Sequence, residues 1–352
     1  MATAEKNLSV RDTSYDWLRL FATLCVVLGH SCYLEMSSDL GGVSYAFPEA
    51  VSAAAASLPY RAVDYLSHFV YAFHMPLFFM LSGAVLALKP LPSLGTLLKT
   101  KARRLLLPYL LYGFFFMFPL KLASGYYTPE TVLPAMGAFL LGGESGHLWF
   151  LPTLFWAMAA FVGLQKLLSR LPKWELWLPL LCALLSLGAA FVPGDLLLIV
   201  RGLQNLFYFA GGFYFEKLYK TRLETSTPKA LVLLLLSAAV FLGIRILDLN
   251  DALGDALLGS LTLYFLSYLC SRWFAKLPST GLWKLLIPNL FYIYLLHDPL
   301  EYVVLRLFLG TGSLTGTPMF LCYLLVRILG IFLLSLALGQ AITWLKRKRK
   351  TA

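Results

Sequence analysis

Charged residues are scarce in this chain. Asp, Glu, Lys and Arg make up 13% of its 352 residues, whereas a soluble globular domain carries about 25%. This deficit argues against a soluble protein. Hydrophobic residues make up 59% of the chain, and the mean hydropathy is +0.74. Apolar runs of roughly 20 residues, long enough to cross a bilayer, recur from one end to the other. The composition therefore predicts an all-α, polytopic integral membrane protein.

Cysteine is also scarce, and no two cysteines form a CxxC pair. All five lie in apolar segments, as Cys25, Cys32, Cys182, Cys270 and Cys322. We interpret them as buried thiols, which form neither a disulfide framework nor a thiolate metal site. The five histidines are spread over four apolar segments without a close pair of ligands. We therefore expect no metal ion.

Negative charge is the scarcer sign, with 18 acidic against 29 basic residues and a net charge of +11. Such an excess invites a nucleic-acid interpretation, but here the basic residues lie between the apolar segments. That placement is typical of the topology signal of a membrane protein. We therefore expect contact with membrane lipid and none with nucleic acid. The sequence carries no signal for an oligomeric state.

The apolar segments number about ten. Their approximate bounds are 15–35, 66–88, 104–123, 147–168, 174–193, 196–218, 229–247, 252–273, 284–308 and 318–345. Basic residues concentrate at the two chain ends and in the even-numbered connections. This distribution predicts that both termini are cytoplasmic. We expect one membrane domain over residues 1–352, without a separate soluble domain.

The first apolar segment carries a polar stripe. Asp16, Arg19, Thr23 and His30 recur at steps of three, four and seven residues, so they share one face of a helix. Arg19 and His30 are separated by a rise of roughly 16 Å. Ionisable groups inside a spanning helix are costly and usually face a cavity or a partner. We interpret this stripe as the lining of an active site, although a lone histidine is also typical of a structural hydrogen bond.

Two further groups of residues are candidates. The run from Lys99 to Arg104 is a topology signal and also a possible anion site, because Lys and Arg at a helix start bind phosphates. The predicted topology places all five histidines toward the outer side of the membrane, together with Glu144, Asp298 and Glu301. Arg306 and Arg327 are interpreted as structural partners or as side chains that extend to the membrane surface.

Five stretches together resemble the membrane acyltransferase 3 family, with motifs closest to its fucose 4-O-acetylase-related branch. They are Arg19-x10-His30 within YDWLRLFATLCVVLGH, FHMPLFFMLSGAVL (73–86), KARRLLLPYLLYG (101–113), HLWFLPTLF (147–155) and IYLLHDPLE (293–301). The resemblance implies a ten-helix core in a bacterial inner membrane. It implies acyl transfer from acyl-CoA, usually acetyl-CoA, to a hydroxyl of a cell-surface or lipid-linked carbohydrate. Lys101 and Arg104 match the family's Arg-x-x-Arg motif, with lysine in the first position.

The resemblance and the residues together assign roles. We expect His30 to act as general base or to accept the acyl group, with His74, Tyr33 or a backbone N–H as donor to the oxyanion. The catalytic candidates are thus His30, Arg19, Asp16 and His74. The candidates for binding CoA are Arg19, Lys101, Arg103 and Arg104, and those on the acceptor side are Glu144, His147, His297 and Glu301.

The alternative is a transporter or flippase for a glycolipid or polysaccharide precursor. Ten spans with intramembrane arginines would serve such a protein equally well. The sequence shows no inverted repeat and no pair of broken helices, which favours the acyltransferase.

Overall fold

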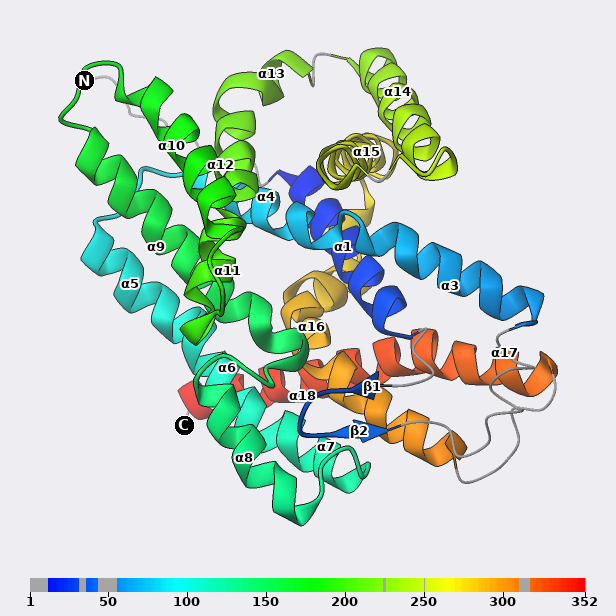
Figure 1. Cartoon of the computed structure of the whole chain (residues 1–352). Coiled ribbons are helices and arrows are strands. Elements are labelled where there is room, and N and C mark those ends of the chain that lie inside the picture. The colour runs from blue at the N-terminus through cyan, green and yellow to red at the C-terminus, as the bar shows by residue number, and fades with distance from the viewer. Residues whose placement is uncertain are drawn as a thin grey trace.

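The computed structural model describes residues 12–31, 36–43, 56–223, 226–249, 251–309 and 317–351, and this part of the chain is almost wholly helical (Figure 1). The predicted all-α fold is confirmed. Within these residues there is one small antiparallel sheet, which pairs β1 (Met36–Ser37) with β2 (Gly42–Val43). The helices are α1 (Thr13–Ser31), α3 (Leu58–Tyr71), α4 (His74–Ala87), α5 (Leu94–Lys101), α6 (Leu107–Tyr112), α7 (Phe118–Ala123), α8 (Pro129–Leu140), α9 (Phe150–Leu168), α10 (Trp174–Ala189), α11 (Ile199–Gln204), α12 (Leu206–Tyr214), α13 (Lys220–Leu223), α14 (Thr227–Ile246), α15 (Ala252–Trp273), α16 (Gly281–Leu309), α17 (Thr317–Leu325) and α18 (Ile331–Thr351).

Six continuous helical segments among the described residues are long and apolar enough to cross a membrane. They are Arg61–Ala87, Leu94–Ala123, Gly146–Leu168, Thr227–Ile246, Ala252–Trp273 and Leu321–Lys348, and a bent pair gives a seventh. The other predicted segments also form helices. However, α10 is only 16 residues long, and α1 and α16 carry ionisable side chains that lower their hydropathy. The multi-pass architecture stands, while the count of ten and the cytoplasmic termini stay predictions.

The bent pair was not expected from the sequence. The segments Leu196–Gln204 and Leu206–Tyr219 meet at 47°. The backbone just before α11 is left-handed at Leu197 and Leu198, with φ of 55° and 61°, a conformation that leucine rarely adopts. Hydrogen bonds hold it there: Leu197 N–H donates to the Leu141 carbonyl at 2.7 Å, and Trp156 Nε1 donates to the Leu197 carbonyl at 2.9 Å.

Close packing of α4 against α12 depends on two glycines. A Cβ atom on Gly83 would lie 2.0 Å from the Phe209 carbonyl oxygen, and one on Gly212 would lie 1.8 Å from the Met80 carbonyl oxygen. Small residues allow helix backbones to approach closely where the hydrophobic effect does not drive association. Larger side chains at either position would therefore separate the two helices.

The start of α1 is anchored by polar contacts. The Asp12 carboxylate accepts hydrogen bonds from Lys220 and Ser14, and the Tyr15 hydroxyl donates to Glu216. Burial by itself raises the pKa of Asp12, but the bonds from Lys220 and Ser14 outweigh that effect and hold the pKa below its usual value. From this anchor α1 runs between α15 and α16, with which it makes extensive contacts. Its polar stripe is thereby fixed in direction.

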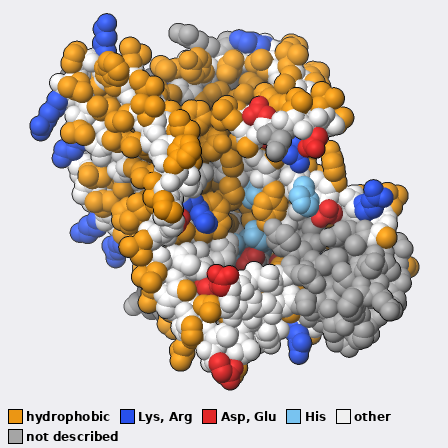
Figure 2. Space-filling model, in the orientation of Figure 1, with side chains coloured by type: hydrophobic (Ala, Val, Ile, Leu, Met, Phe, Trp, Pro, Cys, Tyr) orange, Lys and Arg blue, Asp and Glu red, His pale blue; other side chains and the backbone are white. Residues whose placement is uncertain are grey.

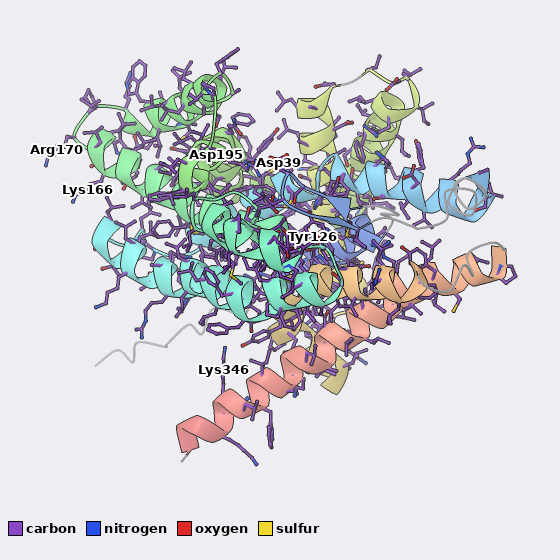
Figure 3. All side chains as sticks on the ribbon, turned by 60° about the horizontal axis from the view of Figure 1, so that its bottom comes forward. Asp39, Tyr126, Lys166, Arg170, Asp195 and Lys346 are labelled. Atoms are coloured by element: carbon purple, nitrogen blue, oxygen red, sulfur yellow. The ribbon has the colours of Figure 1, made fainter. Side chains whose placement is uncertain are left out.

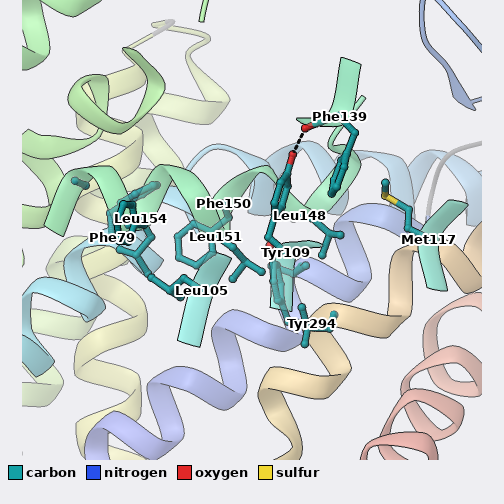
Figure 4. Packing of buried hydrophobic residues seen from close by; sticks show 14 of the residues in the cluster. Phe79, Leu105, Tyr109, Met117, Phe139, Leu148, Phe150, Leu151, Leu154 and Tyr294 are labelled. Atoms are coloured by element: carbon teal, nitrogen blue, oxygen red, sulfur yellow. Dashed lines mark hydrogen bonds between the residues drawn. The ribbon is translucent and has the colours of Figure 1, made fainter. Parts of the chain in front are cut away.

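An aromatic core packs beside this arrangement (Figure 4). The Tyr109 ring stacks on Phe139 at 4.2 Å between centroids, and its hydroxyl donates to the Phe139 carbonyl at 2.7 Å. Phe79 and Phe150 meet edge to face at 5.1 Å. The basic side chains of Lys166 and Arg170 lie at one edge of the molecule (Figure 3).

Candidate active site

A cavity of about 260 Å³ lies between α1, β1, α16 and the short 3₁₀ turn Gly146–Trp149. We call it the histidine cavity. Its lining consists of His30, Met36, Ser37, Gly146, His147, Asp298 and Tyr302. Histidine side chains reach the surface in the hollow at the middle of the face drawn in Figure 2.

Asp298 is at the centre of this cavity. One carboxylate oxygen lies 2.9 Å from His30 Nδ1, and the other lies 3.0 Å from His147 Nδ1. Because a carboxylate only accepts hydrogen bonds, the Nδ1 atom of His30 carries the proton and the lone pair is on Nε2. A carboxylate that orients histidine in this way prepares Nε2 to act as a general base.

The two histidines bound to Asp298 differ in their surroundings. The His30 side chain is 18% exposed, whereas that of His147 is 1% exposed. His147 Nε2 also faces the Leu295 carbonyl at 3.2 Å. Both ring nitrogens of His147 therefore face oxygen atoms. Of the two rings bound to Asp298, that of His30 is the more exposed to the cavity, and that of His147 contacts Asp298 from the buried side.

His297 completes the cluster from α16. Its Nδ1 donates to the carbonyls of Tyr294 at 2.8 Å and Ile293 at 3.1 Å. Its ring meets the rings of His30 and His147 edge to face, at centroid distances of 5.1 Å and 5.2 Å. Three histidines predicted for one layer of the membrane are thus in contact. His297 does not line the histidine cavity, so it packs behind the two rings.

A buried ion pair holds the backbone of His30. Arg327, in the π-helical turn Val326–Gly330, contacts Glu301 at 2.5 Å and donates to the His30 carbonyl at 3.0 Å. It also donates to the Tyr323 hydroxyl at 2.5 Å. Arg327 and Glu301 are both fully buried. His30 is thus fixed by Asp298 at its ring and by Arg327 at its backbone, and Glu301 neutralises Arg327 and does not line the histidine cavity.

Lys121 lies at the end of α7 in a cage of tyrosine rings. Its ammonium is 4.4 Å from the centroid of Tyr126, 4.6 Å from that of Tyr302 and 5.5 Å from that of Tyr127, distances typical of cation–π contacts. Tyr127 donates a hydrogen bond to Glu144 at 2.6 Å. Burial raises the pKa of both Tyr126 and Tyr127, so both phenols stay protonated at neutral pH.

A second cavity, of about 620 Å³, is basic at one part of its wall and apolar elsewhere. We call it the basic cavity. Its cations are Arg19, Lys89, Lys101 and Arg104, and its other lining residues include Thr23, Phe78, Phe150, Ile287, Phe291 and Tyr294. The structure thus brings the polar stripe of α1 to the distant basic run, as predicted from their charges. Arg103, which was predicted to bind CoA, is exposed and does not line this cavity. Lys89 lines it and was not among the predicted residues.

The two cavities share α1 and α16. Arg19 and Thr23 of α1 line the basic cavity, and His30 lines the histidine cavity. Tyr294 of α16 lines the basic cavity, and its hydroxyl donates to the His147 carbonyl at 2.6 Å. The Tyr294 ring meets that of Phe150, which lines the same cavity, at 6.0 Å between centroids. Tyr294 therefore lies at the boundary between the two spaces.

Some predicted site residues lie elsewhere. Asp16 is buried beside Arg19, with 3.7 Å between Oδ1 and Nη1, at the opposite end of the stripe from His30. His74 is buried with its Nδ1 directed to the Val70 carbonyl at 2.9 Å, and it lines neither cavity. Its ring contacts Tyr71, which in turn contacts His30. Tyr33 lies outside the described residues.

Sequence reasoning placed Asp298 in the layer of the histidines without giving it a role. It missed Lys121 and Tyr294 as site residues, and it did not predict the contact of Arg327 with the His30 carbonyl. Asp298 had a usable signal, because it directly follows His297 in a segment with few other polar residues. Lys121 had none, since a single lysine near the end of an apolar segment is typical of a membrane boundary.

The described residues contain no group of three or more His, Cys, Asp or Glu side chains arranged to hold a metal ion. Their cysteines are free thiols: Cys25, Cys182, Cys270 and Cys322. Cys322 is exposed, which corrects the expectation of a buried thiol, and Cys32 lies outside the described residues.

The fold and the site define a multi-pass helical protein with a carboxylate-oriented histidine, a class that includes transferases using a general base. The model of the acyltransferase 3 family, described as an acyltransferase domain, matches residues 12–336, and the chain belongs to this family. No curated protein and no solved structure gives a significant match to the chain. The fucose 4-O-acetylase-related branch stays a prediction.

Proposed function

We propose that this membrane acyltransferase moves an acyl group, most simply acetyl, from cytoplasmic acyl-CoA to a hydroxyl of a cell-surface or lipid-linked carbohydrate. A single observation carries the proposal: α1 contributes Arg19 to the basic cavity and His30 to the histidine cavity. One helix thus joins a site suited to a phosphorylated donor to a site suited to general base catalysis. The family resemblance implies that this reaction takes place in a bacterial inner membrane.

The basic cavity suits CoA in charge and size. Its four cations, Arg19, Lys89, Lys101 and Arg104, match the phosphates by charge-assisted hydrogen bonds. Its apolar wall suits the pantetheine arm, and its volume of about 620 Å³ is within the usual range of cofactor sites. Lys101 supplies a point charge in place of the bidentate fork of an arginine.

The histidine cavity suits the transfer step. The acceptor hydroxyl gives its proton to His30 Nε2 as its oxygen attacks the thioester carbon, while Asp298 stabilises the imidazolium that forms. The alternative order, in which His30 first accepts the acyl group, uses the same lone pair. Asp298 supports either order because it fixes the ring and its tautomer.

The transporter or flippase remains the competing function, and the bent pair that contains α11 and α12 is the feature that favours it. However, the residues of that pair line neither the basic cavity nor the histidine cavity. The feature typical of transporters is therefore separate from the polar site.

The test is turnover of labelled acetyl-CoA by purified protein in lipid nanodiscs with a mixture of glycan acceptors. We expect His30→Ala to lower release of the CoA thiol by about 10²–10⁴-fold. His68→Ala is the matched control, because His68 is 70% exposed on α3 and lines neither cavity. Full transfer by His30→Ala would reject the assignment. Movement of a glycolipid without thiol release would establish the flippase instead.

A further inference from the structure

Acyl transfer through a tetrahedral intermediate needs a donor for the oxyanion. His74, expected for this role, lines neither cavity, and its Nδ1 is already directed to the Val70 carbonyl. Lys121 is not part of the lining either, but it lies directly behind Gly146, which is. We infer that the ammonium of Lys121 is that donor and that it reaches the oxyanion through a gap left by Gly146. This inference rests on the proposed acyl transfer and adds a catalytic residue to it.

Lys121 has the hydrogen-bonding capacity that the role requires. The residue is 2% exposed, and an ammonium carries three N–H donors. Tyrosine rings surround it, but ring faces attract the charge without accepting strong hydrogen bonds. Among the described residues, no oxygen accepts a hydrogen bond from Lys121 Nζ and no carboxylate pairs with it within 4.0 Å. The N–H donors of the ammonium are therefore available to a bound group.

Gly146 connects Lys121 to the histidine cavity. This glycine lines the cavity, and a Cβ atom placed on it would lie 3.5 Å from Lys121 Nζ and 3.8 Å from Asp298 Oδ2. Its φ of +49° also disfavours other residues. A substrate oxygen in the space that a side chain would fill is therefore within reach of the ammonium.

The charges around the cavity leave Lys121 available for an anion. The Asp298 carboxylate is bound by His30 and His147, and the Glu144 carboxylate accepts from Tyr127. A negative charge that develops only in the transition state is the missing partner. An interaction that strengthens at that point raises the rate of the chemical step rather than the affinity for the substrate.

The acceptor oxygen forms a bond to the thioester carbon and gives its proton to His30 Nε2, and the carbonyl electron pair moves to the oxygen, which accepts a hydrogen bond from Lys121. When the carbonyl re-forms, the C–S bond breaks, and the CoA thiolate takes the proton from His30. The products are the ester and the CoA thiol.

The first test is Lys121→Met, which keeps the length of the side chain and removes the charge. We expect kcat for thiol release to fall by about 10²–10³-fold, with KM for acetyl-CoA and for the acceptor changed by less than about threefold. Lys121→Arg should recover part of the loss. Lys166→Met is the control, because Lys166 is exposed on α9 and lines neither cavity, and its kcat per folded molecule should equal that of the wild type.

The second test keeps Lys121 and closes the gap. Gly146→Ala should lower kcat by at least about tenfold, and the double variant Lys121→Met/Gly146→Ala should be no slower than Lys121→Met, because both changes remove one contact. Additive losses would overturn the inference. An unchanged kcat in Lys121→Met would also overturn the inference. The same holds if Lys121→Met only raises KM, and only for an acidic acceptor. If the wild type releases no thiol, the proposed function fails; if only His30→Ala is inactive, this inference alone fails.

Discussion

The basic cavity and the histidine cavity are built on the same two helices but in different ways. The Arg19 side chain is 41% exposed, and Arg104 is also exposed, so charge rather than exact position defines that site. In the histidine cavity, Asp298 and His147 are buried and bound on both sides. The two cavities should therefore be sensitive to different changes. Loss of a positive charge should weaken donor binding in the basic cavity, whereas a shift of His30 or Asp298 should stop the chemistry in the histidine cavity.

The largest expected effect is at Asp298. Asp298→Asn presents an amide to His30 and disturbs its tautomer, so kcat for thiol release should fall by about 10³-fold or more, while acetyl-CoA binding stays unchanged. Asp64→Asn is the matched control, because the Asp64 carboxylate pairs with a histidine, His68, at the surface. Its kcat should equal that of the wild type. A normal kcat in Asp298→Asn would show that Asp298 has a structural role and does not orient the His30 ring for catalysis.

The next effect concerns the buried pair of Arg327 and Glu301. Arg327→Leu leaves a buried carboxylate without its cation, so the free energy of unfolding should fall by about 3–5 kcal/mol, and kcat should fall because the His30 carbonyl loses its donor. Reversible unfolding in mixed micelles measures the first quantity. Arg245→Leu, which breaks the partly exposed pair with Asp255, should cost less. If both variants lost the same free energy of unfolding, burial of the Arg327–Glu301 pair would not explain its importance.

The smallest effect is at the basic cavity. Lys101→Ala/Arg104→Ala should raise the Kd of acetyl-CoA by at least about tenfold, because two charge-assisted contacts are lost, and should leave kcat at saturation within about threefold of the wild type. Lys166→Ala/Arg170→Ala, at the edge seen in Figure 3, removes the same charge without effect on Kd. An unchanged Kd in the first variant would place the donor elsewhere.

Much of this arrangement was predictable because membrane topology converts sequence position into depth. Arg19 and His30 lie on one continuous helix, as the apolar segment predicted, and Lys101 and Arg104 line one cavity with Arg19. Depth alone also placed His147 and His297 near His30. These features follow from helix periodicity and from the cost of burying charge.

The rest depended on side-chain direction, which depth does not specify. His74 lies in a predicted layer with His30, but its ring points back to the Val70 carbonyl in the last turn of α3. Asp298, by contrast, faces two histidines from other elements. Lys89 and Lys121 looked like boundary residues until the tertiary fold brought them to a cavity and a tyrosine cage.

The central claim is that the basic cavity binds the donor and the histidine cavity carries out the chemistry. The most direct test measures binding and turnover of acetyl-CoA in the same nanodisc preparations. The account predicts that His30→Ala binds acetyl-CoA as tightly as the wild type and releases almost no thiol. It predicts that Lys101→Ala/Arg104→Ala binds at least about tenfold more weakly and turns over normally at saturation. Loss of binding in His30→Ala, or loss of turnover at saturation in the double variant, would contradict it.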